Sequence, residues 1–265
     1  MPPARQPLSA VLITLNAATQ IEACLRSLAF CDEIVVVDSG STDGTAELAA
    51  GLGARVLQAE WRGFGPQKQF AVEQAAHDWV LCIDADERVS ERLQQSILAV
   101  TCPRGGSPGA SSALPLAFTG YRFARRNRFM GRYLKHGEGY PDWSLRLFDR
   151  RAARWSDDAV HEKVLAGGKI GTLQGDLLHD SAESLETYLA KQNRYSSLTA
   201  SMALASGKRA TVWHLLLSPL LRFIKFYFFR LGLLDGLPGL VHILVGCAAS
   251  GAKYAKMLAF QQSDV

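Results

Sequence analysis

The sequence predicts an α/β fold built on a mostly parallel sheet, and three features of its first part predict that fold. Short aliphatic runs at residues 10–15, 34–37 and 79–83 are typical of strands buried on both faces. Between these runs, apolar residues recur at helical spacing. A turn of Ser, Gly, Thr and Asp at residues 39–44 supplies caps for the helix after it. We therefore expect alternating strands and helices joined by right-handed crossovers.

The remaining elements of this first part keep the same order. The first helix is predicted to begin at a capping box, Thr19-Gln20-Ile21-Glu22. Residues 55–57 are predicted as the third strand and residues 67–76 as a helix, and the fourth strand ends in Asp84-Ala85-Asp86-Glu87. Ligands of such sheets bind beyond the carboxyl ends of the strands, and Asp38 and Asp84 both lie at such ends. Their position is the first indication of function.

The second part of the chain is less regular. Residues 103–115 are rich in Gly, Ser, Ala and Pro and are predicted to form a flexible surface loop. A basic stretch at 121–136, short strands at 143–148 and within 163–178, and a helix at 184–205 are predicted next. From residue 211 to residue 258 the chain is strongly apolar with scattered basic residues. We predict a catalytic domain over residues 1–205 and an apolar helical segment that associates with a membrane over residues 206–265.

Composition narrows the class of protein. Hydrophobic residues make up 48% of the 265 residues and charged residues 20%, which supplies a core and excludes global disorder. The net charge of +4 excludes a protein that coats polyanions. The five cysteines are scattered and form no Cys-x-x-Cys pair, which indicates reduced thiols in a cytoplasm. The amino-terminal residues lack the pattern of a signal peptide.

Asp84-Ala85-Asp86 carries the strongest chemical signal. Two carboxylates separated by one small residue, directly after a buried strand, offer hard oxygen ligands to Mg²⁺ or Mn²⁺. Such an ion bridges a diphosphate and acts as a Lewis acid toward a leaving nucleoside diphosphate. The alternative is a pair of acidic residues that only caps the end of the strand. The position after a fourth parallel strand favours the metal site.

Other polar residues are predicted at the same edge of the sheet. Thr14 and Asn16 end the first strand, and Asn16 is alternatively a helix-entry residue. Asp38 is placed to accept hydrogen bonds from a base or a ribose, and a turn carboxylate is the alternative. Lys68 is placed to reach a phosphate, and an exposed lysine is the alternative.

These motifs together resemble family 2 glycosyltransferases. The motifs are Ile13-Thr14-Leu15-Asn16, the run from Val36 to Thr45, and Ile83-Asp84-Ala85-Asp86-Glu87. Three further stretches are similar to the branch of bacterial lipopolysaccharide inner-core β-1,4-glucosyltransferases: Tyr140-Pro141-Asp142 with Arg146-Leu147-Phe148, Val160-His161-Glu162, and Leu178-His179. The resemblance covers nearly the whole chain.

The resemblance implies a nucleotide-sugar-binding fold of the GT-A type, Rossmann-like, and a transfer that inverts the anomeric carbon. It implies that Thr14 and Asn16 border the nucleotide and that Asp38 contacts the base. It further implies that Asp84 faces the ribose or the metal and that Asp86 is the main metal ligand. An inverting transfer also needs a carboxylate that deprotonates the acceptor hydroxyl.

The resemblance leaves that general base open between two residues. Glu162 is the first choice, because it takes the place of the acidic motif that follows the acceptor-side strand in related enzymes, and Asp142 is the rival. His161 or His179 would complete the metal shell, and a hydrogen-bonded structural histidine is the alternative for each. Arg146 would pair with a carboxylate or the diphosphate, and an ordinary salt bridge is the alternative.

The basic stretch admits two interpretations. Its clustered arginines, at positions 122, 125, 126 and 128, fit a patch for an acidic acceptor or a leaving diphosphate. The alternative is a solvated charged loop. Nucleic acid is not an expected partner, because no stacking platform of aromatic residues accompanies the arginines.

The apolar segment is predicted to lie in the plane of the lipid headgroups. The run at 212–229 is interrupted by Arg222 and Lys225, and the run at 236–252 is rich in Gly, so neither is expected to span a bilayer. Arg222, Lys225 and Arg230 fall within one arc of a helical wheel, where they would face anionic lipid. The alternatives are a hydrophobic hairpin packed on the sheet and a dimer contact.

The function expected from the resemblance is transfer of a hexose, glucose from UDP-glucose, to a lipid-linked saccharide such as the lipopolysaccharide inner core. The enzyme is expected to need Mg²⁺ or Mn²⁺ and to work in the cytoplasm, on the inner face of the cytoplasmic membrane. A polyprenyl-phosphate sugar transferase and a catalytically inert membrane-docking relative are the alternatives. A nicotinamide oxidoreductase is disfavoured, because no Gly-x-Gly-x-x-Gly follows the first strand.

Overall fold

A computed structural model describes residues 6–101, 118–158, 162–180 and 184–263 of the chain. It divides the chain into two compact units. The first unit comprises residues 1–125 and 143–180, and the second comprises residues 126–142 and 181–265. The second unit therefore includes residues 184–205, which we had predicted as part of the catalytic domain.

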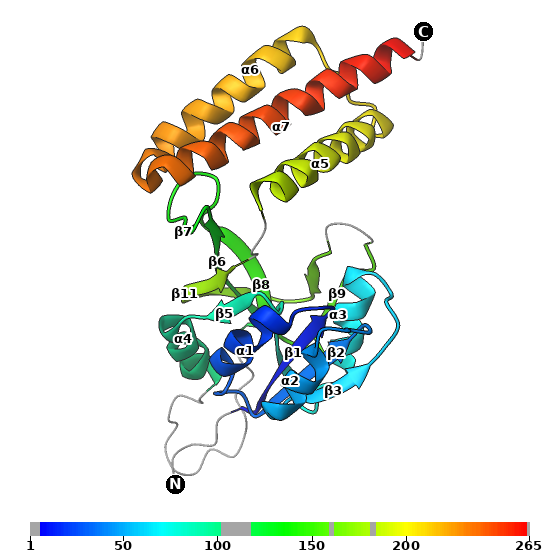
Figure 1. The fold of residues 1–265 in the computed structure, drawn as a ribbon, viewed down its shortest axis with the longest axis vertical. Coiled ribbons are helices and arrows are strands. Elements are labelled where there is room, and N and C mark those ends of the chain that lie inside the picture. Colours follow the sequence, from blue (N-terminus) through cyan, green and yellow to red (C-terminus); the bar gives the residue numbers. More distant parts are fainter. Residues whose placement is uncertain (1–5, 102–117, 159–161, 181–183, 264–265) are drawn as a thin grey trace. The chain divides into compact units, whose positions relative to one another are not determined.

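The first unit begins with the predicted alternation of strands and helices (Figure 1). Its strands are β1 (Leu8–Thr14), β2 (Glu33–Asp38), β3 (Arg55–Gln58) and β4 (Trp79–Cys82), joined by helices α1 (Ala18–Ser27), α2 (Thr45–Gly51) and α3 (Phe64–Glu73). The strands lie in the order β3-β2-β1-β4, and each neighbouring pair is parallel. The prediction of four strand–helix repeats is confirmed.

The same sheet continues with strands from later in the chain. These are β5 (Glu87–Val89), β6 (Gly120–Phe129), β8 (Asp142–Asp149) and β11 (Ile170–His179), and helix α4 (Glu91–Thr101) follows β5. Beyond β4 the order is β8-β6-β11-β5, with β8 antiparallel to β4 and β11 antiparallel to β5. Strands β9 (Ala153–Trp155) and β10 (Val164–Ala166) form a separate antiparallel pair. The sheet is thus mixed, with its parallel part at the amino-terminal strands.

Both faces of the parallel strands are buried, as their continuous aliphatic runs predict. Leu8, Ala10 and Leu12 of β1 pack in one apolar cluster with residues of α1 and α4. Val11, between them, packs in the other cluster with residues of α3. This alternation is the two-residue period of a strand, and it determines which face of the sheet each side chain points to.

Local details differ from the predictions at two helices. Helix α1 begins at Ala18, so the predicted capping box at Thr19 is wrong. The amides at its start are satisfied from another loop instead, because Ala17 N donates to Thr45 Oγ1 at 2.8 Å and Ala18 N to Asp43 Oδ2 at 3.0 Å. Helix α3 begins at Phe64, earlier than predicted.

The basic stretch forms strands rather than a loop. Its first half lies in β6, and the chain then turns back into β7 (Arg132–Tyr133), which pairs with the end of β6 in an antiparallel arrangement. The predicted loop at 103–115 lies outside the described residues.

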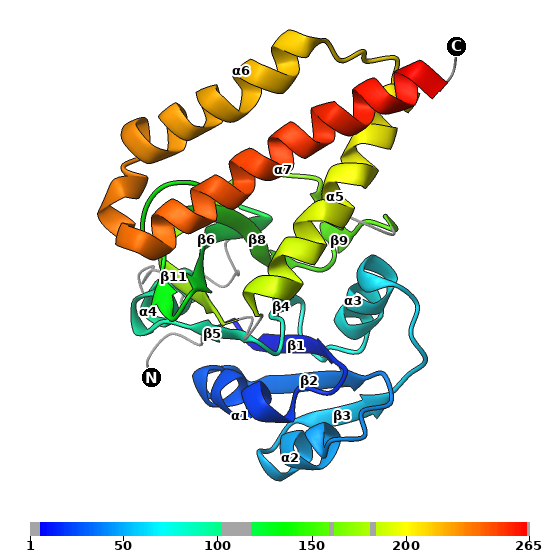
Figure 2. The same ribbon diagram turned by 45° about the horizontal axis from the view of Figure 1, so that its top comes forward.

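The second unit contains the long helices (Figure 2). They are α5 (Leu185–Ala205), α6 (Val212–Phe223) with its π-helical extension η1 (Ile224–Phe229), a 3₁₀ turn η2 (Gly232–Asp235), and α7 (Gly236–Ser263). Helix α7 packs against both α5 and α6. Hydrogen bonds join these helices in pairs: Lys256 Nζ of α7 donates to Asn193 Oδ1 of α5 at 2.7 Å, and the hydroxyls of Ser218 in α6 and Ser250 in α7 lie 2.7 Å apart.

Two segments of this unit, Val212–Phe229 and Gly232–Gln262, are long and apolar enough to cross a membrane by length and composition.

Candidate active site

The carboxyl ends of β1, β2 and β4 meet at one edge of the first unit's sheet. The parallel register places Thr14 beside Asp38, and Val11 beside Cys82 at the end of β4. Thr14 Oγ1 lies 3.1 Å from Asp38 Oδ1 and donates to it. Parallel pairing therefore gathers the strand-end residues of the predicted site, as expected for this class of sheet.

The Asp38 side chain is hydrogen-bonded to the turn that follows it. The side chain is buried and accepts hydrogen bonds from Gly40 N at 3.0 Å, from Ser41 N at 2.8 Å and from the Ser41 hydroxyl. Burial alone would raise the pKa of this carboxyl, but the hydrogen bonds it accepts have the larger combined effect. The pKa of Asp38 therefore lies below its ordinary value. With Thr14 included, both carboxylate oxygens already have two donors each. This geometry favours the turn role that was the alternative for Asp38.

Asn16 ties two loops of this edge together. Its backbone has φ of 52°, in the left-handed region that Asn tolerates better than most residues. Its Oδ1 accepts from Thr42 N at 2.9 Å, and its own N–H donates to Ser41 Oγ at 2.8 Å. The loops after β1 and β2 are therefore cross-linked through one exposed side chain.

Lys68 joins two of the predicted site carboxylates. The lysine is buried on α3, and its Nζ lies 3.1 Å from Asp84 Oδ1 and 3.0 Å from Glu162 Oε1. The ammonium also lies 4.9 Å from the centre of the Trp155 ring. Lys68 is therefore not the exposed lysine that was its alternative, and it holds Glu162 close to the end of β4.

Arg146 occupies the other side of the same carboxylate. Its Nη2 lies 2.8 Å from Asp84 Oδ2 and 3.5 Å from Glu87 Oε1. Glu87 is fully buried, and its Oε2 accepts from Asp84 N at 3.0 Å. Arg125 approaches Glu87 as well, at 3.5 Å. No role is predicted for Glu87 from the sequence, since nothing local to it indicates that two arginines reach it from β6 and β8.

The two carboxyls of this cluster, the half-buried Asp84 and the fully buried Glu87, respond differently to their surroundings. Burial alone would raise the pKa of Asp84, but Arg146 and Lys68 hold it well below its usual range. Burial raises the pKa of Glu87, and there the arginines only partly offset it. Asp84 is thus a permanent anion at neutral pH whose two oxygens are both engaged by cations.

Arg146 retains one hydrogen-bond donor. Among the described residues, its buried Nη1 has no hydrogen-bond partner. A small cavity of about 10 Å³ lies beside it, lined also by Lys68 and Asp84. A buried N–H without an acceptor is unfavourable by roughly 1–3 kcal/mol, so this atom is a donor that favours a bound acceptor.

Asp86 and His179 form a second group with different chemistry. His179 Nε2 lies 3.1 Å from Asp86 Oδ2, and both side chains are partly exposed. The β5–β11 register pairs His179 with Glu87, which brings the imidazole next to the turn that carries Asp86. Among the described residues, no Lys or Arg forms an ion pair with Asp86.

A carboxylate oxygen with an imidazole nitrogen fits Mn²⁺ better than Mg²⁺, because Mg²⁺ prefers oxygen ligands, and either ion also binds a diphosphate. The described part of the chain holds no group of three or more His, Cys, Asp or Glu residues arranged around a common metal position. Two protein ligands leave coordination positions for phosphate oxygens and water, as is usual for an ion that binds its substrate's phosphates.

The roles of two further residues stay predictions. Asp142 is the first residue of β8 and belongs to the second unit, so its role stays a prediction. His161 lies outside the described residues.

The arginines of the basic stretch are held by different partners. Arg122 is exposed, stacks on Trp143 at 5.1 Å and donates to Thr172 Oγ1. Arg125 reaches Glu87, as described above, and Arg126 donates to the carbonyl of Leu134. The predicted anion patch stays a prediction, but at least Arg125 serves the buried cluster.

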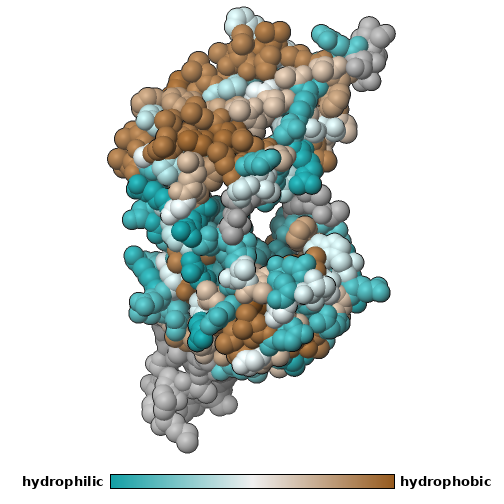
Figure 3. All heavy atoms as spheres, in the orientation of Figure 1, coloured by the Kyte–Doolittle hydropathy of each residue, from teal (hydrophilic) through white to brown (hydrophobic). Residues whose placement is uncertain are grey.

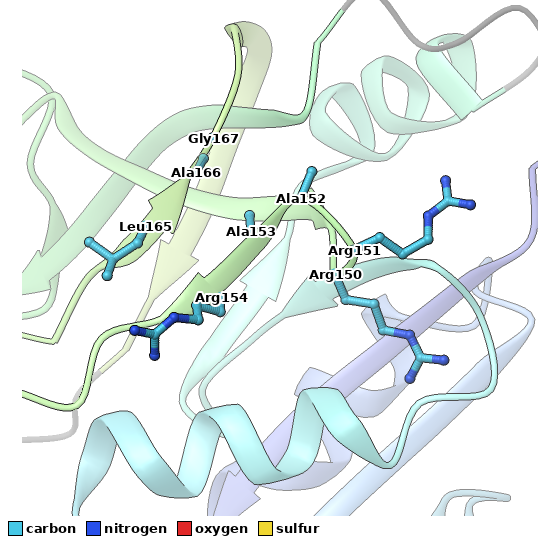
Figure 4. Close-up of a pocket in the computed structure, with 8 residues that line it drawn as sticks. All are labelled: Arg150, Arg151, Ala152, Ala153, Arg154, Leu165, Ala166 and Gly167. Carbon is cyan, nitrogen blue, oxygen red and sulfur yellow. The ribbon is translucent and has the colours of Figure 1, made fainter.

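A shallow pocket of about 430 Å³ lies elsewhere on the first unit, around β9 and β10 (Figure 4). Of its three arginines, Arg150 and Arg151 extend away from Arg154 rather than toward a common point. Arg150 Nη1 donates to the Ala75 carbonyl at 2.6 Å, and Arg151 pairs with Asp149 and Asp78. Since β8 runs antiparallel to β4, these arginines follow the end of β8 near the start of β4, at the opposite edge from Asp84. This pocket therefore lacks the converging groups of an anion site.

The fold is an α/β architecture with polar and charged groups gathered at the carboxyl ends of its parallel strands, and comparison with known proteins assigns the family. Residues 9–103 match the model of glycosyl transferase family 2. The chain is 36% identical to the lipopolysaccharide core biosynthesis glycosyltransferase LpsC of Rhizobium meliloti over 95% of this chain and 92% of that protein. It is 30% identical to the uncharacterized glycosyltransferase RT0209 of Rickettsia typhi, over 94% and 86% of the two chains.

Among solved structures, the S. aureus TarS fragment 1–349 in complex with UDP is similar, at 16% identity, 97% and 92% coverage and a TM-score of 0.47. The chain belongs to glycosyl transferase family 2. The predicted GT-A-type α/β fold with apolar carboxyl-terminal helices is confirmed.

Proposed function

We propose that this protein is an inverting, metal-dependent hexosyltransferase that moves glucose from UDP-glucose to a saccharide of the lipopolysaccharide inner core. The observation that carries the proposal is the Asp86–His179 pair at 3.1 Å, next to a cation-balanced cluster that includes Glu162. The acceptor class is supported by the 36% identity to LpsC, whose name assigns it to lipopolysaccharide core biosynthesis.

On the donor side, Asp86 and His179 would hold Mg²⁺ or Mn²⁺. The metal, when bound, would neutralise the charge of the departing nucleoside diphosphate. Asp84 serves a different purpose in this proposal, because Lys68 and Arg146 already engage its two oxygens. It holds these two cations in place at the edge of the sheet where the phosphates would bind.

On the acceptor side, Glu162 is the general base. Its carboxylate takes the proton of the acceptor hydroxyl while that oxygen attacks the anomeric carbon and the bond to the diphosphate breaks. Lys68, 3.0 Å from Glu162 Oε1, keeps the carboxylate in position. Asp142 stays the rival for this role.

The experiment compares Glu162→Gln and Asp142→Asn in transfer from UDP-glucose to purified core acceptor. We expect Glu162→Gln to lower kcat by roughly 10²–10⁴-fold, the usual contribution of a general base, with little change in KM for UDP-glucose. Glu91→Gln, at an exposed position in the first turn of α4, is the matched control and should be neutral. A large loss in Asp142→Asn alone would exchange the two roles, and full turnover in Glu162→Gln would favour transfer to a phosphate acceptor, which needs no base.

The proposal includes work at the inner face of the cytoplasmic membrane. A lipid-linked core acceptor is confined to that surface. Two apolar segments of the second unit, Val212–Phe229 and Gly232–Gln262, support a membrane-bound enzyme, since each has the length and composition of a membrane helix.

A further inference from the structure

The outward face of α6 is an uninterrupted apolar surface. Its exposed large side chains are Val212, Trp213, Leu216, Leu217, Leu220 and Leu221, which are between 44% and 70% accessible. They recur in adjacent pairs every four residues and therefore cover one side of the helix. Further exposed apolar residues continue this surface through η1 and η2, where Phe229 is 81% accessible. Apolar side chains gather over α6 and α7 in Figure 3.

The polar residues of α6 lie on its other side, and each has a partner inside the second unit. His214 bonds to Thr211 and stacks on Tyr254 of α7, with ring centres 5.3 Å apart. Ser218 bonds to Ser250 of α7. The helix thus turns its hydrogen-bonding groups toward its own unit, which is the reverse of a helix on the surface of a soluble protein.

Arg222 follows the same pattern, against our expectation. It was predicted to face anionic lipid, but its guanidinium pairs with Glu138 in the chain segment after β7. Arg222 Nε lies 3.1 Å from Glu138 Oε2. A helical wheel alone could not reveal this pairing, because the partner comes from a distant part of the sequence.

Both ends of α6 and η1 are fastened to polar chain segments. At the η2 end, the buried Asp235 carboxylate accepts from the backbone amides of Lys135 and His136, at 2.9 and 2.7 Å. At the other end, Ala210 N donates to Gln261 Oε1 at 2.7 Å. If the helix crossed a bilayer, the polar segment attached to one of its ends would have to pass through the hydrocarbon, where each unsatisfied polar group costs several kcal/mol. The helix is therefore suited to lie along a membrane rather than across it.

We propose that the outward face of α6, with the continuing surface of η1 and η2, inserts sideways into the acyl chains of one membrane leaflet. The inference deepens the membrane part of the proposed function and rests on it. Hydrocarbon fits better than a protein partner, because protein interfaces carry about one hydrogen bond per 100–200 Å² and the face at residues 212–221 presents almost only apolar side chains. The attraction comes from apolar burial, so the charge of the headgroups is secondary.

The test is flotation of the full-length protein with vesicles of zwitterionic phosphatidylcholine, at low salt and at about 0.5 M salt, where surface charge is screened. We expect binding in both conditions. Leu216→Glu with Leu220→Glu should lower the vesicle-bound fraction by about tenfold or more, because charged side chains are strongly disfavoured in hydrocarbon. Leu198→Glu is the matched control, since Leu198 is 40% exposed but lies on α5, and it should bind like the unchanged protein.

Depth is measured with Trp213. Lipids brominated on their acyl chains should quench the part of the emission that disappears in Trp213→Phe. Binding only to anionic vesicles, release by salt, or equal loss in Leu198→Glu would each overturn the proposal. So would a dimer in light scattering that the Leu216/Leu220 changes dissociate, because the face would then belong to a second copy.

The membrane and transferase proposals fail separately. UDP-glucose hydrolysis in vesicle-free buffer should be unchanged in the Leu216/Leu220 variant, since α6 carries none of the proposed site residues. Normal flotation together with the absence of any donor turnover would contradict the transferase proposal but not the membrane inference.

Discussion

Asp84 and Asp86 stand two positions apart in one strand-end motif, yet the protein gives them opposite surroundings. Asp84 lies between Lys68 and Arg146, with both oxygens engaged by cations. Asp86 is partly exposed and its ion-pair partner among the described residues is a histidine. The neighbours supplied by distant elements, more than the motif itself, therefore decide which carboxylate can bind a cation. Each of the following changes tests one side of that contrast.

The largest expected effect is on turnover in Asp86→Ala. Loss of the proposed metal ligand removes several kcal/mol of transition-state stabilisation, which corresponds to about 10³-fold in rate. Folding should be nearly unaffected, since the side chain is partly exposed and its ion-pair partner in the described part of the chain is His179. Transfer assays across Mn²⁺ and Mg²⁺ concentrations check the loss, with Asp78→Ala, an exposed aspartate, as the control. Normal metal-dependent turnover in Asp86→Ala would show that Asp86 is not the metal ligand and would contradict its contrast with Asp84.

The next effect is on stability in Asp84→Asn. The substitution leaves Lys68 and Arg146 buried without their shared anion, so we expect about 3 kcal/mol of destabilisation at neutral pH in urea unfolding. The pKa of Asp84 is lowered in the folded state, so its contribution is present above the unfolded pKa of about 4 and is lost as the pH falls below it. The difference between the two proteins should therefore shrink in acid. A constant difference would mean that Asp84 does not act through its charge.

The smallest expected effect comes from Gly65→Ala, which disturbs only the Asp84 side. A Cβ at this position would lie 2.1 Å from the Ser156 carbonyl oxygen, so α3, with Lys68, must shift. We expect about 1–3 kcal/mol of destabilisation, typical of overpacking. Titration of activity with Mn²⁺ should give the same half-saturating concentration as the unchanged protein. A large increase in that concentration would show that the two sides are coupled.

The sequence predicts the parallel half of the fold well. Continuous aliphatic runs and helical spacing encode β1 to β4 locally, and parallel pairing then forces Thr14, Asp38 and Asp84 to one edge. The same reasoning cannot find Glu87, because its burial depends on arginines from β6 and β8. It also misplaces Arg222, whose partner Glu138 is set by tertiary packing. In each failure the deciding contact joins residues far apart in the chain.

The cross-linked loops after β1 and β2 have a consequence for ligand recognition. Asn16 Oδ1 holds Thr42 N, Asp43 holds Ala18 N, and Asp38 organises its own turn, all through protein groups alone. A rim already fixed in this way loses little conformational entropy when a ligand arrives. More of the contact free energy then appears as affinity, and the shape of the rim selects its ligand by rigidity instead of by adaptation.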